Sequence, residues 1–471
     1  MVDGFSEVVV GGTMQMWKRS FIIALGALIV ATLIWSTRAE AQRGVPLIRD
    51  AEIEALIRDY AEPIFQAAGL GGRNVGIYLV RSSSFNAFVA DGRRIFINTG
   101  ALFQSDTPNQ LIGVIAHETG HIAGGHLARL REQISRTRTA TLATMLAGVA
   151  AAVAVGAAGG DASTAAQVGQ ATILGGRSVA QRGFLAYRRA EEIAADRSAV
   201  TYLNATGQSA HGMIETFEKF AGRAALTTRY ADPYTRSHPV ARDRIGALER
   251  IAQASPYFQR RDPPALQVRH DMMRAKLSGF LDNPRTVLRR YPRSDNSLPA
   301  RYARAIARFR TADIRSAIRE IDALIREQPR NPYFHELKGQ ALMESGRARE
   351  ALKPLRQAVQ LAPNENLIRI SYGQALVAAG GQQNMSAAVG ELKRGLSREP
   401  DHAAGWRQLA MAHGRLGQNG DAALASARSY FADGQMSLAK QQAKRAQALL
   451  RRGSPGWLQA DDILNVRTPR S

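Results

Sequence analysis

The chain has 471 residues, a length typical of about three domains, and 45% of its residues are hydrophobic, which excludes a wholly disordered protein. It has no cysteine, so disulfides, thiolate metal ligands and a cysteine nucleophile are excluded, and any metal must be bound by histidine and carboxylates. The formal charge of +22 would suit anionic lipid or nucleic acid. The excess is mostly arginine without a compact basic run or a nucleic-acid motif, so we expect no nucleic-acid partner.

The N-terminus has the pattern of an export signal. Lys18 and Arg19 precede an apolar run at 21–35, and Ala39-Glu40-Ala41 is a small-x-small cleavage site. We therefore expect a signal peptide at 1–41, with residues 1–15 as an upstream extension, and a mature chain that begins at Gln42 in the bacterial periplasm. An uncleaved N-terminal anchor is the alternative.

The next segment predicts a small sheet followed by helices. Apolar residues recur at helical spacing over 47–70. Strands are expected at 75–80, 85–88 and 94–98, with the turn pair Asp91-Gly92 between the last two. The pattern is then helical, so residues 42–264 are predicted to form an α+β domain.

The motif His117-Glu118-Thr119-Gly120-His121 lies in this helical region. Histidines four residues apart share one face of a helix and can bind one zinc ion. Glu118 can then take a proton from a zinc-bound water and pass it to the leaving amine. Buried histidine pairs without metal also occur, so the five-residue pattern alone does not decide.

Residues 139–160 carry no charge, but 13 of the 22 are alanine or glycine. The larger apolar residues lie mostly on one helical face, and a turn follows at 159–161. We expect a helical hairpin near 139–180, inserted between two parts of the active site. Membrane crossing, a dipping or gating hairpin with peripheral membrane contact, and plain core packing remain open.

A third metal ligand is expected beyond this insert. Catalytic zinc sites need one more histidine or carboxylate and leave the fourth position to water. Glu192 is a candidate, and Asp196, one turn further along the same helix, could hydrogen-bond a ligating histidine. Alternatively, Glu191, Glu192 and Asp196 form a solvated acidic face.

The C-terminal third contains an internal repeat. Three alanine–proline pairs each lie 12 residues apart, and the prolines step by 34 and then 37 residues. Gly339 and Gly373 occupy equivalent positions, where small residues let two helices pack closely. The pattern resembles the tetratricopeptide repeat (TPR). We expect TPR-like repeats at 265–455 and a tail at 456–471; the pairs are Ala317/Pro329, Ala351/Pro363 and Ala388/Pro400.

The His-Glu-Thr-Gly-His motif together with Glu192-x-x-Ala195-Asp196 resembles the M48 family of zinc metallopeptidases. The resemblance implies a zincin-like fold and one zinc ion per chain, held by His117, His121 and Glu192 rather than Glu191. His126 fits a family histidine that is not a ligand. The overall expectation is thus an α+β zincin-like metallopeptidase domain followed by an all-α TPR solenoid.

Two further regions are expected to contribute to the active site. Ser237-His238-Pro239, followed by Arg244-Ile245, is similar to a family segment that approaches the zinc, so His238 either caps the metal in a latent state or stabilises the oxyanion. We also expect the strand at 94–98 to pair with an extended substrate, through Ile95, Phe96, Ile97 and Asn98.

A signal peptide combined with TPR repeats resembles periplasmic members of the family. In those members the repeats dock on the outer-membrane barrel assembly machinery, and the protease removes misfolded or stalled barrel precursors. The implied function is a zinc-dependent endopeptidase of outer-membrane protein quality control. The alternative is a periplasmic chaperone or scaffold that acts mainly through its repeats.

Overall fold

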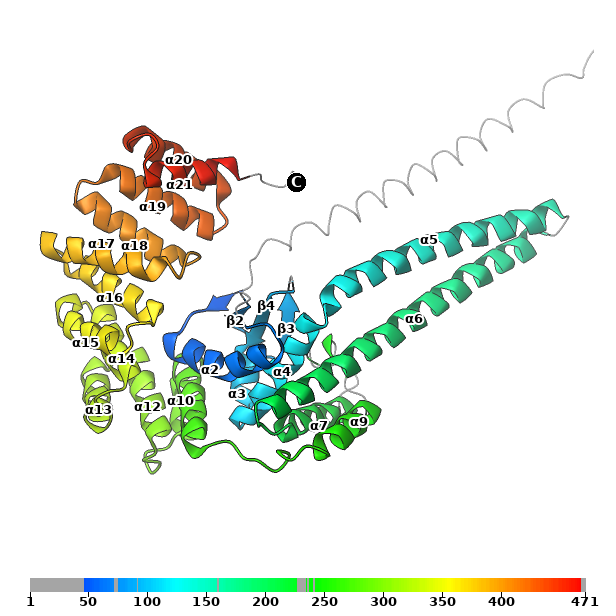
Figure 1. Ribbon diagram of the computed structural model, residues 1–471, viewed down its shortest axis with the longest axis horizontal. Coiled ribbons are helices and arrows are strands. Elements are labelled where there is room, and N and C mark those ends of the chain that lie inside the picture. Colours follow the sequence, from blue (N-terminus) through cyan, green and yellow to red (C-terminus); the bar gives the residue numbers. More distant parts are fainter. Residues whose placement is uncertain are drawn as a thin grey trace, which may run out of the picture. The chain divides into compact units, whose positions relative to one another are not determined.

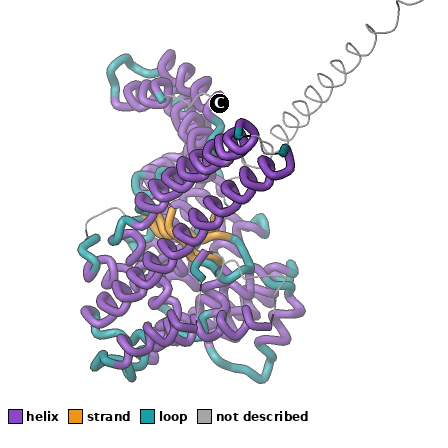
Figure 2. Tube along the Cα trace, turned by 90° about the vertical axis from the view of Figure 1, so that its right-hand side faces the viewer, coloured by secondary structure: helices purple, strands orange, loops and turns teal. Residues whose placement is uncertain are grey.

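The computed structural model describes residues 46–71, 75–90, 92–158, 161–226, 234, 237–239 and 242–466. The signal peptide expected at 1–41 lies outside the described residues. The fold class expected from the sequence is confirmed: a small sheet lies among helices, and helical repeats follow (Figures 1 and 2).

The sheet has the order β1-β2-β4-β3. Its strands are β1 (Leu47–Ile48), β2 (Gly76–Val80), β3 (Ala87–Ala90) and β4 (Arg94–Asn98). β4 pairs in parallel with β2 and antiparallel with β3, so the predicted hairpin is present. β4 therefore has a hydrogen-bonded neighbour on both sides and is a central strand.

The peptidase core is formed where helices pack on this sheet. Helix α2 (Ala51–Ala67) is capped by Asp50, whose side chain accepts from the Ile53 amide, and it buries Ile53, Leu56 and Ile57. The same core includes apolar side chains of β4 and of further helices. Those helices are α3 (Thr99–Gln104), α4 (Pro108–Ala123), α6 (Ala162–Ala205), α7 (His211–Leu226) and α9 (Arg242–Gln253).

The expected insert is a long helical hairpin. Helix α5 (His126–Ala157) and the distal part of α6 run side by side in both views (Figures 1 and 2). A Cβ atom added to Gly169 would lie 2.9 Å from the carbonyl oxygen of Gly148, so small residues permit this close approach. α6 then continues without interruption into the peptidase core, where it ends.

The C-terminal region is an array of helical pairs. The predicted alanines Ala317, Ala351 and Ala388 are fully buried, and a Cβ atom on Gly339 would lie 2.3 Å from the side chain of Leu355. The helices are α10 (Pro264–Leu281), α11 (Pro284–Arg290), α12 (Leu298–Arg310), α13 (Ile314–Glu327), α14 (Pro332–Glu344), α15 (Ala348–Leu361), α16 (Asn366–Ala379), α17 (Gln382–Leu396), α18 (Ala403–Arg415), α19 (Asn419–Ala432), α20 (Met436–Leu449) and α21 (Pro455–Asn465).

The packing at the two ends of the repeat region adds detail to the expected domain division. Helix α10 contributes Met273 and Leu277 to the peptidase core and Met272 to the first repeat core, so the two regions share a helix. The segment expected as a tail begins with α21, whose Ala460 and Ile463 are buried against the last repeat helices. The buried face of α21 has only a few apolar residues, so the sequence did not show it as part of a repeat.

A buried charge cluster lies between α10 and the start of α2. The ammonium group of Lys276 is 2.8 Å from Asp50 Oδ2 and 3.1 Å from Glu52 Oε2, and Lys276 is only 5% exposed. Glu336 of α14 lines a cavity together with Lys276 and Asp50. The repeats and the peptidase core are therefore joined by ionic as well as apolar contacts.

Candidate metal centre

Helix α4 presents His117 and His121 from inside the protein. Thr107 caps the helix by accepting from the Gln110 amide, and Pro108 occupies the first turn. The helix is buried along almost its whole length, so the motif has no solvated face from His117 to Gly120. The two imidazoles lie one turn apart, with ring centroids 4.7 Å apart.

Gly120 determines how closely α6 approaches this helix. A Cβ atom at this position would lie 2.8 Å from the carbonyl oxygen of Ala195 and 3.1 Å from its Cα. Because glycine has no Cβ, the backbone of α6 can pack directly on α4. That contact places Glu192 and Asp196 beside the two histidines.

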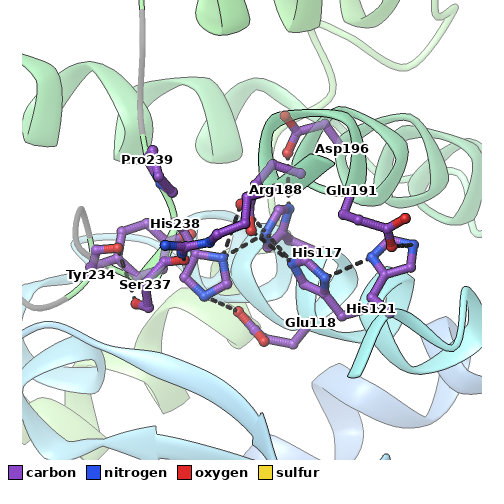
Figure 3. Close-up of polar contacts among 12 residues, drawn as sticks. His117, Glu118, His121, Arg188, Glu191, Asp196, Tyr234, Ser237, His238 and Pro239 are labelled. Atoms are coloured by element: carbon purple, nitrogen blue, oxygen red, sulfur yellow. Dashed lines mark hydrogen bonds and ion pairs between the residues drawn. The ribbon is translucent and has the colours of Figure 1, made fainter. Parts of the chain in front are cut away.

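A third segment brings His238 to the same point. Arg188 of α6 donates from Nη2 to the carbonyl oxygen of Ser237, and the Ser237 hydroxyl donates to Asn86 Oδ1 at 3.1 Å. The ring of His238 is buried and points toward His117 and His121 (Figure 3). The segment that carries His238 is therefore hydrogen-bonded both to α6 and to Asn86, which directly precedes β3.

The donor atoms of these residues converge. His117 Nε2 is 3.1 Å from His121 Nε2, 3.2 Å from His238 Nδ1 and 3.4 Å from Glu192 Oε2. His121 Nε2 is 3.5 Å from Glu192 Oε1, and His238 Nδ1 is 3.0 Å from Glu192 Oε2. All four donors lie within 4.8 Å of one another.

These separations fit a metal ion. A tetrahedral ion with bonds of about 2.0–2.1 Å holds its donor atoms roughly 3.4 Å apart. Imidazole nitrogens that face each other at 3.1 Å share at most one proton, so a cation between them satisfies lone pairs that would otherwise repel. His117, His121, Glu192 and His238 thus form a site that could hold a metal.

Glu118 is a buried carboxylate beside the donor cluster. It is 1% exposed, and neither carboxylate oxygen has a hydrogen-bond partner in the described part of the chain. Nε2 of His238 lies 3.3 Å from Oε1 of Glu118 (Figure 3). Burial raises the pKa of Glu118, and His238 partly offsets that effect. A buried carboxylate with a raised pKa is a candidate for taking up a proton during a reaction.

Asp196 connects His117 to a buried arginine. Asp196 Oδ1 lies 2.9 Å from His117 Nδ1, and Arg244 donates to both carboxylate oxygens at 2.6 and 2.8 Å. Burial would raise the pKa of Asp196, but Arg244 and His117 lower it. Burial would likewise lower the pKa of His117, but Asp196 and Glu192 raise it to about 9. Asp196 therefore fixes the His117 ring so that Nε2 faces the donor cluster.

Arg244 also contacts Glu192, with Nη1 3.0 Å from Oε2. The sequence placed Arg244 only in the segment after His238 and assigned it no role. Nothing in the sequence near Arg244 indicates that it pairs with Asp196, which is 48 residues away. Its burial beside two carboxylates appears only when α6 and α9 are packed together.

His126 lies outside the donor cluster. Its Nδ1 is 2.8 Å from Nδ1 of His121, on the side of the ring away from the other donors, and its Nε2 is 3.2 Å from Glu191 Oε2. Glu191 also pairs with Arg129. Glu191 and His126 therefore hold the outer side of His121.

A pocket of about 330 Å³ opens beside the cluster. Glu118, His121 and His238 form its polar floor. Its apolar walls come from the base of the hairpin and from β3, and they include Leu127, Leu130, Ile134, Phe184, Phe88 and Val89. The pocket offers room for a side chain next to the reactive groups.

The substrate strand expected at 94–98 is corrected by the strand order. β4 is hydrogen-bonded to β2 and β3 on its two sides, so its backbone cannot pair with a substrate. Ile95, Ile97 and Asn98 are also buried. The alternating pattern identified a strand but carries no information about which strand lies at the edge.

The fold and the site together define a metallopeptidase: histidines on one helix, a glutamate on a second, and a buried carboxylate beside them. Residues 47–252 match the model of Peptidase family M48. Residues 47–252 are therefore similar to an M48 peptidase domain, and TPR-like repeats follow them.

Two relatives are similar in sequence to this chain over most of their own length. The β-barrel assembly-enhancing protease of Escherichia coli is 23% identical over 418 residues, which cover 87% of this chain and 82% of the relative. The putative β-barrel assembly-enhancing protease of Vibrio cholerae is 24% identical over 382 residues, which cover 80% and 76%.

Two solved structures are similar to a part of the chain. YrrB, a TPR protein with an unusual peptide-binding site, is 17% identical and covers 37% of this chain and 91% of its own, with a TM-score of 0.31. MamA MSR-1 C2 is 16% identical and covers 35% and 93%, with a TM-score of 0.30.

Proposed function

We propose that the protein is a zinc-dependent endopeptidase of the bacterial periplasm that degrades misfolded or stalled outer-membrane proteins. The convergence of His117, His121, Glu192 and His238 carries the peptidase part of this proposal. The export signal expected at 1–41 and the names of the relatives support the location and the class of substrate.

Zinc suits this set of donors. Nitrogen and carboxylate ligands at tetrahedral spacing are typical of catalytic zinc sites, and the chain offers no thiolate. When bound, zinc would supply Lewis acidity that polarises the scissile carbonyl and makes water a better nucleophile. Glu118 would take a proton from the attacking water and deliver it to the leaving amine. His117 and His121 would remain fixed by Asp196 and His126 throughout.

The substrate would pair with β3 rather than with β4. Among the described strands β3 ends the sheet next to the pocket, and its residues Phe88 and Val89 line that pocket. An extended peptide added to this edge would run past Glu118. Side chains of the peptide would then enter the apolar pocket at the base of the hairpin.

We also propose that the repeats bind a protein partner at the outer membrane. The relatives are named for β-barrel assembly, so the barrel assembly machinery is the partner we favour. Pull-down of that machinery by the full chain, repeated with a chain altered on exposed repeat positions, would test it.

The central test is the substitution Glu118→Gln. It keeps the shape of the side chain but removes the base, so bound zinc should stay at one ion per chain while cleavage of unfolded β-casein falls at least ~100-fold. The control is Glu132→Gln, which makes the same change at an exposed carboxylate outside the donor cluster and should leave cleavage unchanged. Cleavage that survives Glu118→Gln would refute the proposed mechanism.

His238 would restrain the resting enzyme by occupying the fourth donor position. Its Nδ1 lies 3.2 Å from His117 Nε2, inside the donor cluster, which favours capping over a role in oxyanion binding. His238→Ala should then keep zinc and cleave casein faster than the parent chain. A loss of cleavage with zinc retained would instead assign His238 to transition-state stabilisation.

A further inference from the structure

The distal hairpin presents an unusual amount of apolar surface. The described part of the chain has eighteen large hydrophobic side chains that are exposed, and nine of them lie on α5 and α6. Leu146, Val153 and Val179 are 72%, 66% and 63% exposed. Among the described helices, α5 is also the one that is long and apolar enough to cross a membrane. Almost none of its apolar stretch is buried.

This surface does not arise from loose packing of the hairpin itself. Gly148 and Gly169 face each other, and a Cβ atom on Gly176 would lie 2.3 Å from the side chain of Thr144. The two helices thus use their small residues against each other. Most of their larger apolar residues are left on the outside, where nine side chains are between 38% and 72% exposed.

Charges are divided sharply along the hairpin. Residues 139–158 and 162–176 contain no charged residue, and the turn between them has Asp161, which caps α6. The base, in contrast, carries exposed arginines and only one exposed acidic residue, Glu132, which pairs with Arg136. The exposed arginines near the base are Arg129, which pairs with Glu191, and Arg131, Arg136, Arg138, Arg177, Arg182 and Arg189.

We propose that the distal hairpin, residues 139–176, embeds its apolar outer face in an anionic phospholipid bilayer. An apolar segment next to a basic base is the pattern of helices that bind lipid surfaces, with arginines at the headgroups. The apolar stretch of α5 is about 28 Å long at 1.5 Å per residue, long enough to lie along the membrane surface with its apolar face in one leaflet.

The polar residues of α6 set the depth. Gln167, Gln170 and Asp161 would be costly within hydrocarbon. The hairpin therefore enters one leaflet and does not cross the bilayer. The arginine side chains are long enough to reach headgroups while their methylenes lie against apolar surface.

The absence of cysteine permits a local test on the full chain. Leu146→Cys can be labelled alone with an environment-sensitive fluorophore, and Leu458→Cys on α21, 52% exposed, is the matched control. Vesicles of phosphatidylcholine with about one third phosphatidylglycerol should shift the emission at 146 to the blue, and vesicles of phosphatidylcholine alone should do so much less. The label at 458 should not respond to either.

A second measurement separates insertion from simple attraction of a basic chain. The double variant Leu146→Gln/Val153→Gln should bind anionic vesicles about ten-fold more weakly in flotation. The control Leu288→Gln/Leu458→Gln removes two equally large exposed residues from the repeats and should bind like the parent. All these chains have the same N-terminus, so differences among them report on the hairpin.

Three results would overturn the proposal. The first is no emission change at 146 with anionic vesicles. The second is equal binding by the Leu146→Gln/Val153→Gln chain, which would mean adsorption by charge alone. The third is an emission change without vesicles that grows with protein concentration, which would assign the hairpin to contact between two copies of the chain.

Discussion

Replacement of Gly120 by alanine should loosen the metal centre without touching a donor. The added Cβ would lie 2.8 Å from the carbonyl oxygen of Ala195, whereas ordinary contact begins at 3.4 Å, so α4 and α6 must separate by about 0.6 Å. Glu192 lies on α6 less than one turn from Ala195 and must follow that movement. Metal sites tolerate errors of about 0.2 Å in ligand position. We therefore expect zinc affinity to fall roughly 10–100-fold.

Stability should change less than affinity. Alanine is favoured over glycine in a helix by about 1 kcal/mol, and overpacking costs roughly 1–3 kcal/mol. The net loss in free energy of unfolding should be about 1 kcal/mol. Gly183→Ala is the matched control, because Gly183 lies on α6 with no atom within 4 Å of the added Cβ. That variant should be more stable by about 0.5–1 kcal/mol and bind zinc normally.

Competition with a chromophoric chelator measures zinc affinity, and urea unfolding of the metal-free chains measures stability. If Gly120→Ala matched the parent chain in both, the close approach of α6 to α4 would not be what holds Glu192 in place. If Gly183→Ala lost affinity as well, the effect would belong to glycine replacement in general.

Two further predictions concern the charge cluster at the junction with the repeats. Lys276→Met leaves Asp50 and Glu52 buried without their cation and should lower the free energy of unfolding by about 3–5 kcal/mol, whereas Lys338→Met removes a more exposed ion pair and should cost at most about 1 kcal/mol; equal losses in urea unfolding would contradict this. Burial, aided by Asp50 and Glu52, raises the pKa of Glu336 to about 8 against the opposing effect of Lys276. The folded chain then retains a proton that the unfolded chain has lost, so stability should fall as the pH rises from about 4.5 to 8. Glu336→Gln should flatten that pH dependence, and an unchanged slope would show that another group causes it.

The repeats were the most predictable part of the fold. Their alanines and glycines recur because each pair of helices repeats the same close packing, and the structure buries Ala317, Ala351 and Ala388 as that pattern requires. The hairpin was likewise visible as two apolar stretches around a turn. The shared helix α10 was not, because one helix that serves two cores has no boundary signal of its own.

At the site, local spacing and long-range packing contributed differently. The spacing of His117 and His121 is fixed by the helix, so the sequence alone places them on one face. Glu192 lies on a separate helix, and its approach depends on a missing Cβ at Gly120. Strand order depends on how the chain folds back, so the sequence alone did not show that β4, the strand expected to pair with substrate, has a neighbour on both sides. Arg244 was missed for the same reason, because its partner Asp196 is 48 residues away.

Helix α6 has a mechanical consequence. One unbroken rod of 44 residues carries the outer hairpin at its start and Glu192 and Asp196 near its end. Thirty residues separate Ala162 from Glu192, a lever of about 45 Å at 1.5 Å per residue. A tilt of about one degree at Glu192 displaces the far end by roughly 0.8 Å. Conversely, a sideways force on the far end would rotate α6 about the metal centre and shift Glu192 and Asp196.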